Sequence, residues 1–470
     1  MAGIGFALRK LVQKDDINGV VQAFGYSAFA AAGPWLFTVI CLFGINLVGT
    51  MVSSVDAIEN FRLVVVYNNC FAILVSSPVA VIATRYTSDR IYDKKVDDIP
   101  GVLLLSLLLV YGTCALIAIP LYFGYAKMTS DYALLSVINF CLMGGIAVVG
   151  VFLTALKDYV TISVVFAVGM LVSFLGAWYL AGPYGAHGML FGFSIGLALI
   201  QFVIATKIFA EYPYHFRIPE NFFGYFRKHW DLGLGIFLYN AGAWVDKWIM
   251  WFAPEHRRYD NNLIAYPGYD SAMFLAYISI IPAISIFTVI LEANFFEKYV
   301  AYYRDIIKHC SFFKIKENHK EIISVLKTNS KNLFVLQAAC SIITIIISPY
   351  LIDALRMNYL QIGMFRIGVL GALFQVIFLY ILIILIYFEV KREVLLLQFF
   401  FFLSNAVFSF ISLKLGFPFY GYGYFFSTLL SMSGAYIFAI YKLRDLPYLT
   451  FIQNNPSTGG KRGVLLFTGR

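Results

Sequence analysis

Long apolar runs, separated by short polar or Gly/Pro-rich breaks, dominate the pattern along the chain. A transmembrane helix needs about 20 predominantly apolar residues. Twelve runs approach or exceed this length, at roughly 23–53, 63–84, 101–123, 132–156, 159–180, 189–210, 232–253, 272–293, 334–356, 364–388, 394–415 and 420–441. Most connections are short, so neighbouring helices must pack antiparallel. The pattern predicts an all-α membrane protein of about twelve transmembrane helices.

The first run follows a basic segment and contains three consecutive alanines, Ala30 to Ala32, as a cleaved signal peptide can. The apolar part of a signal peptide is only about 7–15 residues long. This run stays apolar to about Ser53. We therefore expect a retained membrane anchor.

Two longer connections divide the chain. Residues 211–231 hold two prolines and follow the sixth run, which is typical of a linker between helix bundles. Residues 294–333 carry eight Lys/Arg, which indicates a cytoplasmic helical hairpin or docking surface, or equally a basic loop that touches anionic lipid. The predicted parts are an amphipathic segment (1–22), a six-helix bundle (23–210), a linker (211–231), a second six-helix bundle with a cytoplasmic loop (232–441, loop 294–333) and a tail (442–470).

The basic residues predict the orientation in the membrane. An even number of spans places both termini on one side. If that side is the cytoplasm, 27 of the 35 Lys and Arg residues lie in cytoplasmic segments. Cytoplasmic loops are enriched in Lys and Arg. Both termini are therefore expected in the cytoplasm, and the net charge of +9 is mainly a signal of topology, with no indication of nucleic acid.

Composition agrees with the apolar pattern. Of 470 residues, 60% are hydrophobic and 13% charged, whereas soluble proteins have about 25% charged residues. The six cysteines and six histidines show no metal or disulfide spacing, and no phosphate loop or nucleophile elbow is present. We expect no enzymatic activity, no metal and no cofactor.

Charged residues inside the seventh run are the main candidates for function, because charge within a membrane is costly. Asp246 and Lys247 lie well inside this run. Gly235, Tyr239, Gly242 and Asp246 form one helical stripe, on which the glycines allow close approach of another backbone. Candidate residues lining a transport path are Asp246, Lys247, Asn240, Tyr239, Trp244, Trp248, Glu292 and Arg366.

A structural role for the same charges stays open. Adjacent residues on a helix do not face each other, so Asp246 and Lys247 are expected to have separate partners, with Arg366 and Glu292 as candidates. Other amides inside runs, such as Asn68 and Asn139, are explained by ordinary hydrogen bonds between helices. Pro34, Pro78 and Pro282 fall inside runs and are candidate hinges, with a static kink as the alternative.

A weak internal repeat supports two related halves. Residues 32–35 read Ala-Gly-Pro-Trp, and residues 241–244 read Ala-Gly-Ala-Trp. The two elements lie at matching positions inside the first and the seventh run, where a six-plus-six duplication would place them. Membrane transporters are commonly built from repeated halves with a binding site between them.

Three elements of the sequence resemble a known family. These are the opening MAGIGFALRKL, the following GYSAFAAAGPW and the WVDKW element at 244–248. They are similar to the PelG family of the multidrug/oligosaccharidyl-lipid/polysaccharide exporter superfamily. The resemblance implies export of an exopolysaccharide across the bacterial inner membrane during biofilm matrix production, through a cavity between two helix bundles. It also implies a PelF-like cytoplasmic glycosyltransferase and PelD- and PelE-like membrane proteins as partners.

Two alternatives remain at this point. Within the same superfamily, the chain could be a flippase for a lipid-linked oligosaccharide or a cation-coupled drug exporter. In another class, it could be a membrane scaffold for a polysaccharide synthase that transports nothing. A scaffold has no physical reason to keep Asp246 and Lys247 inside a membrane helix.

Overall fold

The computed structural model describes residues 17–155, 159–289, 295–355, 357–448 and 450–451. The predicted amphipathic segment up to residue 16, Glu292 and the tail beyond 451 lie outside the described residues. The elements are α2 (Ile17–Val52), α3 (Val55–Tyr92), α4 (Ile99–Ile119), the π-helix η1 (Pro120–Tyr125), α5 (Ser130–Ala155), α6 (Tyr159–Glu211), α7 (Phe222–Lys228), α8 (Trp230–Met250), β1 (Arg257–Arg258), β2 (Ile264–Ala265), α9 (Pro267–Ile278), α10 (Ile281–Val289), α11 (Phe296–Ile307), α12 (Phe312–Ile346), α13 (Ser348–Ala354), α14 (Gln361–Tyr387), α15 (Lys391–Leu415), the 3-10 helix η3 (Phe417–Phe419), α16 (Tyr422–Arg444) and α17 (Leu446–Tyr448).

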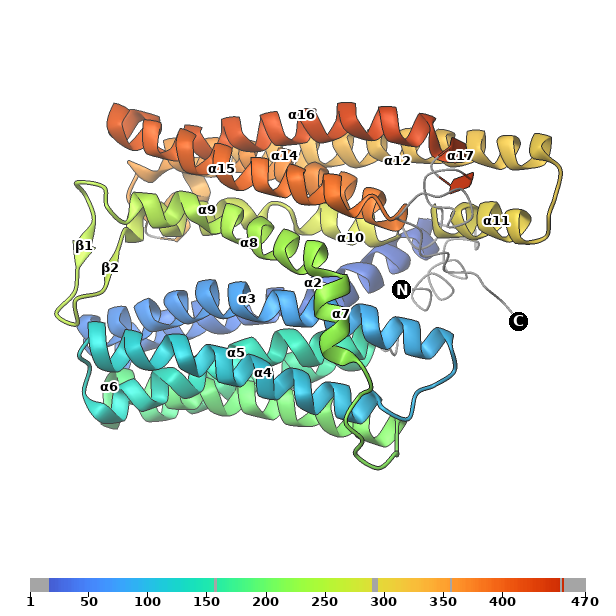
Figure 1. Ribbon diagram of the computed structural model, residues 1–470. Helices are drawn as coiled ribbons and strands as arrows, with labels where there is room; N and C mark the ends of the chain where they lie inside the picture. The colour runs from blue at the N-terminus through green and yellow to red at the C-terminus, as the bar shows by residue number, and fades with distance from the viewer. Residues whose placement is uncertain (1–16, 156–158, 290–294, 356, 449, 452–470) are drawn as a thin grey trace. The chain divides into compact units, whose positions relative to one another are not determined.

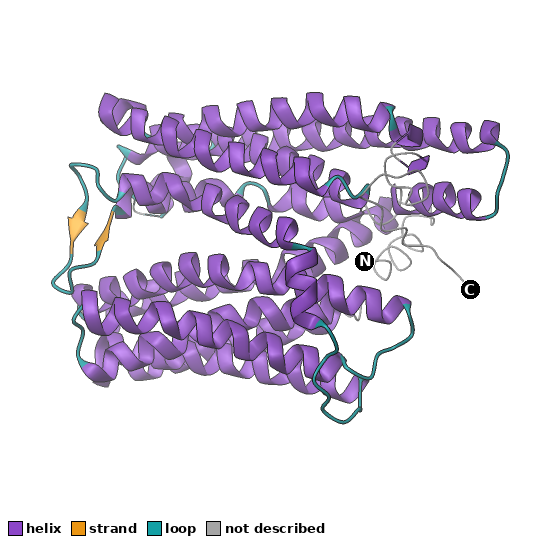
Figure 2. Ribbon diagram, in the orientation of Figure 1, coloured by secondary structure: helices purple, strands orange, loops and turns teal. Residues whose placement is uncertain are grey.

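The predicted all-α class is confirmed, since helices make up nearly all of the described chain (Figure 2). The strands β1 and β2 are two residues each and pair antiparallel, with Arg257 opposite Ala265. Within the described ranges, nine helices are long and apolar enough to cross a membrane. One of them, in α6, covers two of the twelve predicted runs, while α8 and the pair α9/α10 are not among the nine. The count of twelve therefore stays a prediction.

The described residues divide into two compact units. The α8 unit comprises residues 29–271 and 391–423, and the α12 unit comprises residues 17–28, 272–390 and 424–451. The α8 unit contains α3 to α8 and α15, and the α12 unit contains α10 to α14 and α16. The predicted boundary between two six-helix bundles at 211–231 stays a prediction.

Helix α6 is a hairpin of two arms, which explains how one 53-residue element covers two predicted runs. Gly185 breaks the helix with φ 55°, a left-handed conformation that favours glycine. After the break, Gly188, Gly192 and Gly196 repeat every fourth residue and face the first arm. Small residues at this spacing let two membrane helices approach backbone to backbone.

Replacing Gly192 with Ala is expected to force the two arms of α6 apart. The added Cβ would lie 2.2 Å from the backbone nitrogen of Ala177. Overpacking of this kind costs about 1–3 kcal/mol. Thermal unfolding in detergent would measure the loss, with Gly112→Ala as the control, because a Cβ at Gly112 meets nothing within 4 Å. Equal stability of the two variants would contradict the close approach.

Buried amides connect the helices of the α8 unit. The Asn68 amide donates to Oδ1 of Asn139 at 2.8 Å and to the Ser136 carbonyl at 3.1 Å. Asn139 in turn donates to Ser194 Oγ at 2.9 Å, and the Tyr122 hydroxyl donates to Asn68. These bonds join α3, η1, α5 and α6 and satisfy polar groups that lipid cannot hydrate. The prediction that these amides hold helices together is confirmed.

A charged and aromatic site on α8

Helix α8 is fixed by close contact with α15. A Cβ at Gly235 would lie 2.2 Å from Gln398 Oε1, and one at Gly242 would lie 2.7 Å from the Phe401 ring. The Asn405 amide donates to the Gly242 carbonyl at 2.7 Å. The predicted glycine stripe therefore does allow the close approach expected of it. This packing fixes the rotation of α8 and hence the direction of its charged residues.

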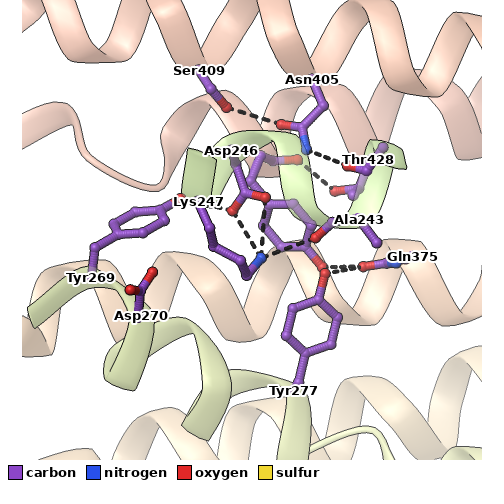
Figure 3. A network of polar contacts seen from close by, with 12 residues as sticks. Ala243, Asp246, Lys247, Tyr269, Asp270, Tyr277, Gln375, Asn405, Ser409 and Thr428 are labelled. Atoms are coloured by element: carbon purple, nitrogen blue, oxygen red, sulfur yellow. Dashed lines mark hydrogen bonds and ion pairs between the residues drawn. The ribbon is translucent and has the colours of Figure 1, made fainter. Parts of the chain in front are cut away.

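Asp246 and Lys247 form a buried ion pair on α8 (Figure 3). The Lys247 ammonium lies 3.0 Å from Asp246 Oδ2 and 3.1 Å from Oδ1. The Tyr269 hydroxyl donates to Asp246 Oδ2 at 3.0 Å. Asp246 is 0% exposed and Lys247 is 5% exposed. The pair is thus withdrawn from solvent and held by a third residue from α9.

The ion pair differs from the expectation that each charge has its own partner. The two side chains do leave the helix in different directions. The flexible four-carbon stem of Lys247 nevertheless lets its ammonium reach back to Asp246, the preceding residue. The same ammonium donates to the Ala243 carbonyl at 3.1 Å and lies 5.8 Å from the centre of the Trp244 ring. Pairing within one helix leaves Asp246 and Lys247 together with no net charge, which lowers the cost of placing the two residues in a membrane.

Aromatic rings of α3 stack on rings at the C-terminal end of α8. Tyr67 stacks on Trp251, with ring centres 4.7 Å apart and an interplanar angle of 18°. One turn along α3, Phe71 stacks on Trp248 at 5.5 Å and 8°. We call Tyr67, Phe71, Trp248 and Trp251 the aromatic ladder. Only Trp248 is a candidate from the sequence, because stacking between residues about 180 positions apart leaves no local signal.

A second carboxylate lies beside the aromatic ladder. The Trp251 indole donates to both carboxylate oxygens of Asp270, at 3.2 Å and 3.0 Å. Asp270 lies on α9 beside Tyr269, the residue that holds Asp246. The ladder and the ion pair are therefore two ends of one polar and aromatic site, which we call the α8 site. It consists of Asp246, Lys247, Tyr269, Asp270 and the aromatic ladder.

The connection from α8 to α9 is attached to the first turns of α3. Arg257 forms an ion pair with Glu59 at 2.6 Å. The Tyr67 hydroxyl donates to the Ile264 carbonyl at 2.7 Å. In the same connection, Glu255 accepts from the Tyr420 hydroxyl at 2.9 Å. This segment is thus hydrogen-bonded to Tyr67, one member of the aromatic ladder.

The other candidates from the sequence are not all near the ion pair. Tyr239 packs against Phe401 with ring centres 5.8 Å apart, and Asn240 is half-buried. Arg366 donates to Ser348 Oγ at 2.8 Å within the α12 unit. Pro34 and Pro78 lie inside continuous helices, whereas Pro282 follows directly on the break between α9 and α10. Glu292 is outside the described residues.

The fold and this site together define a class. Several long apolar helices, with a charge pair and stacked aromatic rings in their interior, are typical of a polytopic membrane transporter. The described residues include no cluster of His, Cys, Asp and Glu that could hold a metal ion.

Solved transporter structures share this fold. A transporter of the multidrug/oligosaccharidyl-lipid/polysaccharide exporter superfamily from Pyrococcus furiosus aligns with a TM-score of 0.66 and 12% identity, covering 90% of this chain and 96% of that chain. An outward-facing multidrug resistance MATE family transporter aligns with a TM-score of 0.65, 11% identity and the same coverage. An inward-facing one aligns with a TM-score of 0.60 and 13% identity, covering 90% and 99%. These similarities show the fold.

The family model of PelG, the exopolysaccharide exporter family (EPS-E), matches residues 1–451, and the chain belongs to this family. None of the curated proteins compared with the chain matches it. The chain is thus a multi-pass protein of the bacterial inner membrane that transports exopolysaccharide. Its family and fold are those of transporters and not of enzymes.

Proposed function

We propose that the exopolysaccharide passes along the side of α8 that carries the α8 site. The observation that carries this proposal is the ion pair of Asp246 and Lys247, buried on α8 beside stacked aromatic rings, in a segment that the sequence predicts to cross the membrane. Replacing a buried ion pair by well-packed apolar residues is often neutral or stabilising. A role in transport supplies the reason for keeping both charges.

The chemistry of the site suits a sugar chain. Sugar rings have apolar faces that pack on aromatic rings, and hydroxyl and amide groups that bond to charged and polar side chains. The faces that the rings of the aromatic ladder now present to each other are the faces that a sugar would occupy. Sugar and partner ring therefore compete for the same surface, and this competition keeps binding weak enough for movement.

Movement of α8 against its neighbours accompanies transport in this proposal, with Pro34, Pro78 and Pro282 as hinges. Pro282 has the strongest support. It follows a break at Ser279 and Ile280, where the Ser279 carbonyl accepts from the buried Gln337 amide at 3.2 Å. Interrupted helices whose carbonyls are satisfied by neighbouring side chains are common where transporters bend. The division into two six-helix bundles with a cavity between them is part of the same proposal.

The proposed partners follow from the family. A PelF-like glycosyltransferase makes the polymer in the cytoplasm, and PelD- and PelE-like proteins join the exporter in the membrane. A polymer that is made on one side of a membrane and needed on the other must be handed directly from synthase to exporter. The proposed assembly provides this transfer.

Transport can be tested in inverted membrane vesicles that contain the exporter and the glycosyltransferase with its sugar nucleotide. We expect new polymer inside the vesicles, protected from an added glycosidase, only when the exporter is present. Vesicles with Asp246→Asn/Lys247→Met exporter should protect much less polymer. Protection of a lipid-linked oligosaccharide but not of polymer would favour the flippase alternative. If the polymer were equally protected from the glycosidase in vesicles without the exporter, the chain would not be the transporter, and its role as a scaffold for the synthase would be favoured.

A further inference from the structure

Helices α11 and α12 form a stiff hairpin in the α12 unit (Figure 1). Lys298 pairs with Glu321 at 2.6 Å. Nearer the turn, Asp305 accepts from the Asn318 amide at 2.9 Å and lies 3.5 Å from the Lys314 ammonium. Although burial acts in the opposite direction, these two neighbours lower the pKa of Asp305. The Asp305 contacts persist at neutral pH and hold the two arms together.

The base of this hairpin is attached to the ends of two other helices. The His319 ring bonds to the Leu443 carbonyl at 2.7 Å, near the end of α16. The Tyr299 hydroxyl donates to the Tyr387 carbonyl at 3.1 Å, at the end of α14. The turn of the hairpin lies beyond both attachments (Figure 1). The tip is therefore carried on a fixed base.

The length of α12 would carry the tip outside a bilayer that this helix crosses up to its far end. An α-helix rises about 1.5 Å per residue, so the 35 residues of α12 span about 52 Å, against a hydrocarbon core of about 30 Å. If the core began at Ile346, the far end of α12, it would end after about 20 residues, near residue 327. Phe312 would lie about 22 Å further along the helix, well beyond headgroups that add about 5–8 Å on each side. A helix tilt of about 20° changes this by only one or two residues.

The tip nevertheless exposes large apolar side chains. Phe312 is 64% exposed, Phe313 is 78% exposed and Ile307 is 47% exposed. Lys308 and Lys316, which are close to them in the sequence, are exposed as well. Exposed apolar patches rimmed by polar residues mark sites of interaction. With the tip outside the bilayer on the predicted cytoplasmic side, the expected partner is a cytoplasmic protein.

We infer that the hairpin tip docks a cytoplasmic protein through an apolar pocket with an acidic rim, and that this protein is the polymer-making glycosyltransferase. The identity of the partner rests on the proposed function. Charge excludes the ends of this chain, because residues 1–16 and 452–470 both carry more basic than acidic residues. A second copy would bring Lys308 and Lys316 against their own equivalents, and like charges at an interface are unfavourable.

The docking is measured as binding of the purified glycosyltransferase to the full-length exporter in detergent. We expect Phe312→Ser/Phe313→Ser to weaken binding about tenfold or more, and Lys308→Glu/Lys316→Glu to weaken it and remove its salt dependence. The matched controls are Phe223→Ser and Arg227→Glu/Lys228→Glu, which change an exposed aromatic and two exposed basic residues of α7. Both controls should bind as the parent does. Unchanged binding by the tip variants overturns the inference.

A fluorescent label at the tip distinguishes docking of the glycosyltransferase from binding to lipid. A polarity-sensitive fluorophore on Phe313→Cys, with Cys310→Ser to remove the neighbouring thiol, should shift to the blue only when the glycosyltransferase is added. A blue shift in anionic nanodiscs without that protein would assign the tip to lipid and overturn the inference. Binding is measured without transport. Normal docking by an exporter that moves no polymer would therefore refute the proposed path and leave the docking site intact.

Discussion

Replacing Lys247 alone with Met is expected to lower the free energy of unfolding by about 3–5 kcal/mol, the usual cost of leaving one buried charge without its partner. Asp246 is 0% exposed, so water cannot compensate the lost ammonium, and the Tyr269 hydroxyl supplies only one neutral hydrogen bond. Asp246→Asn alone should also destabilise, because the Lys247 ammonium loses its ion pair, although the Ala243 carbonyl and the face of Trp244 stay in contact with it. Unfolding in detergent would measure both effects.

The double variant Asp246→Asn/Lys247→Met separates stability from transport. With neither charge present, most of the lost stability should return, because no buried charge is left unpaired. The introduced amide oxygen can still accept a hydrogen bond from Tyr269. If the pair belongs to the transport path, this folded protein should export much less polymer per molecule than the parent. Normal export by the double variant would reject the path role, and single variants as stable as the double would reject the ion pair.

The sequence predicts the helices well because apolar length is a local property. The runs at 159–180 and 189–210 correspond to the two arms of α6, and the break falls on Gly185, in the gap between them. The eighth predicted run is different. It is apolar from 272 to 293, yet the structure divides it into α9 and α10 just before Pro282. A proline in an apolar run is compatible with a kink or with a break, and at this break the Ser279 carbonyl accepts a hydrogen bond from Gln337.

The site is predictable only in part, for a physical reason. The cost of charge in a membrane identifies Asp246 and Lys247 from the sequence. Their pairing depends on how far a lysine side chain can bend, which helical geometry at the Cα level does not describe. Tyr67 and Phe71 are ordinary aromatic residues of an apolar helix, and they become part of the site only because α3 packs against α8.

The role of the hairpin of α11 and α12 could not be predicted from the sequence alone. Eight basic residues indicate a cytoplasmic segment, but composition alone leaves a docking surface and a lipid-bound loop equally open. The length of α12 as one continuous helix favours the docking surface, because a helix that crosses the membrane up to Ile346 would carry Phe312 and Phe313 beyond the headgroups. Helix continuity across a membrane boundary is a property of the folded chain that hydropathy does not report.

Removing the two tryptophans of the aromatic ladder should reduce export about a hundredfold per folded molecule. Aromatic contacts contribute up to about 1.5 kcal/mol each beyond their buried area, and two such contacts correspond to roughly two factors of ten in rate. The change Trp248→Leu/Trp251→Leu keeps apolar side chains of moderate size but removes the flat faces that a sugar ring needs. Export of polymer into inverted vesicles, divided by the amount of folded exporter, would measure the effect.

A matched control makes this result specific to the ladder. Trp178 on α6 also stacks on a phenylalanine, Phe174, with ring centres 6.3 Å apart, but it is 49% exposed and belongs to no part of the α8 site. Trp178→Leu should export as the parent does. The single change Trp251→Phe keeps a flat ring but loses the hydrogen bond to Asp270, so it should export at an intermediate rate. If the double leucine variant exports at the rate of the Trp178 control, the ladder only packs α3 against α8, and the sugar follows another route.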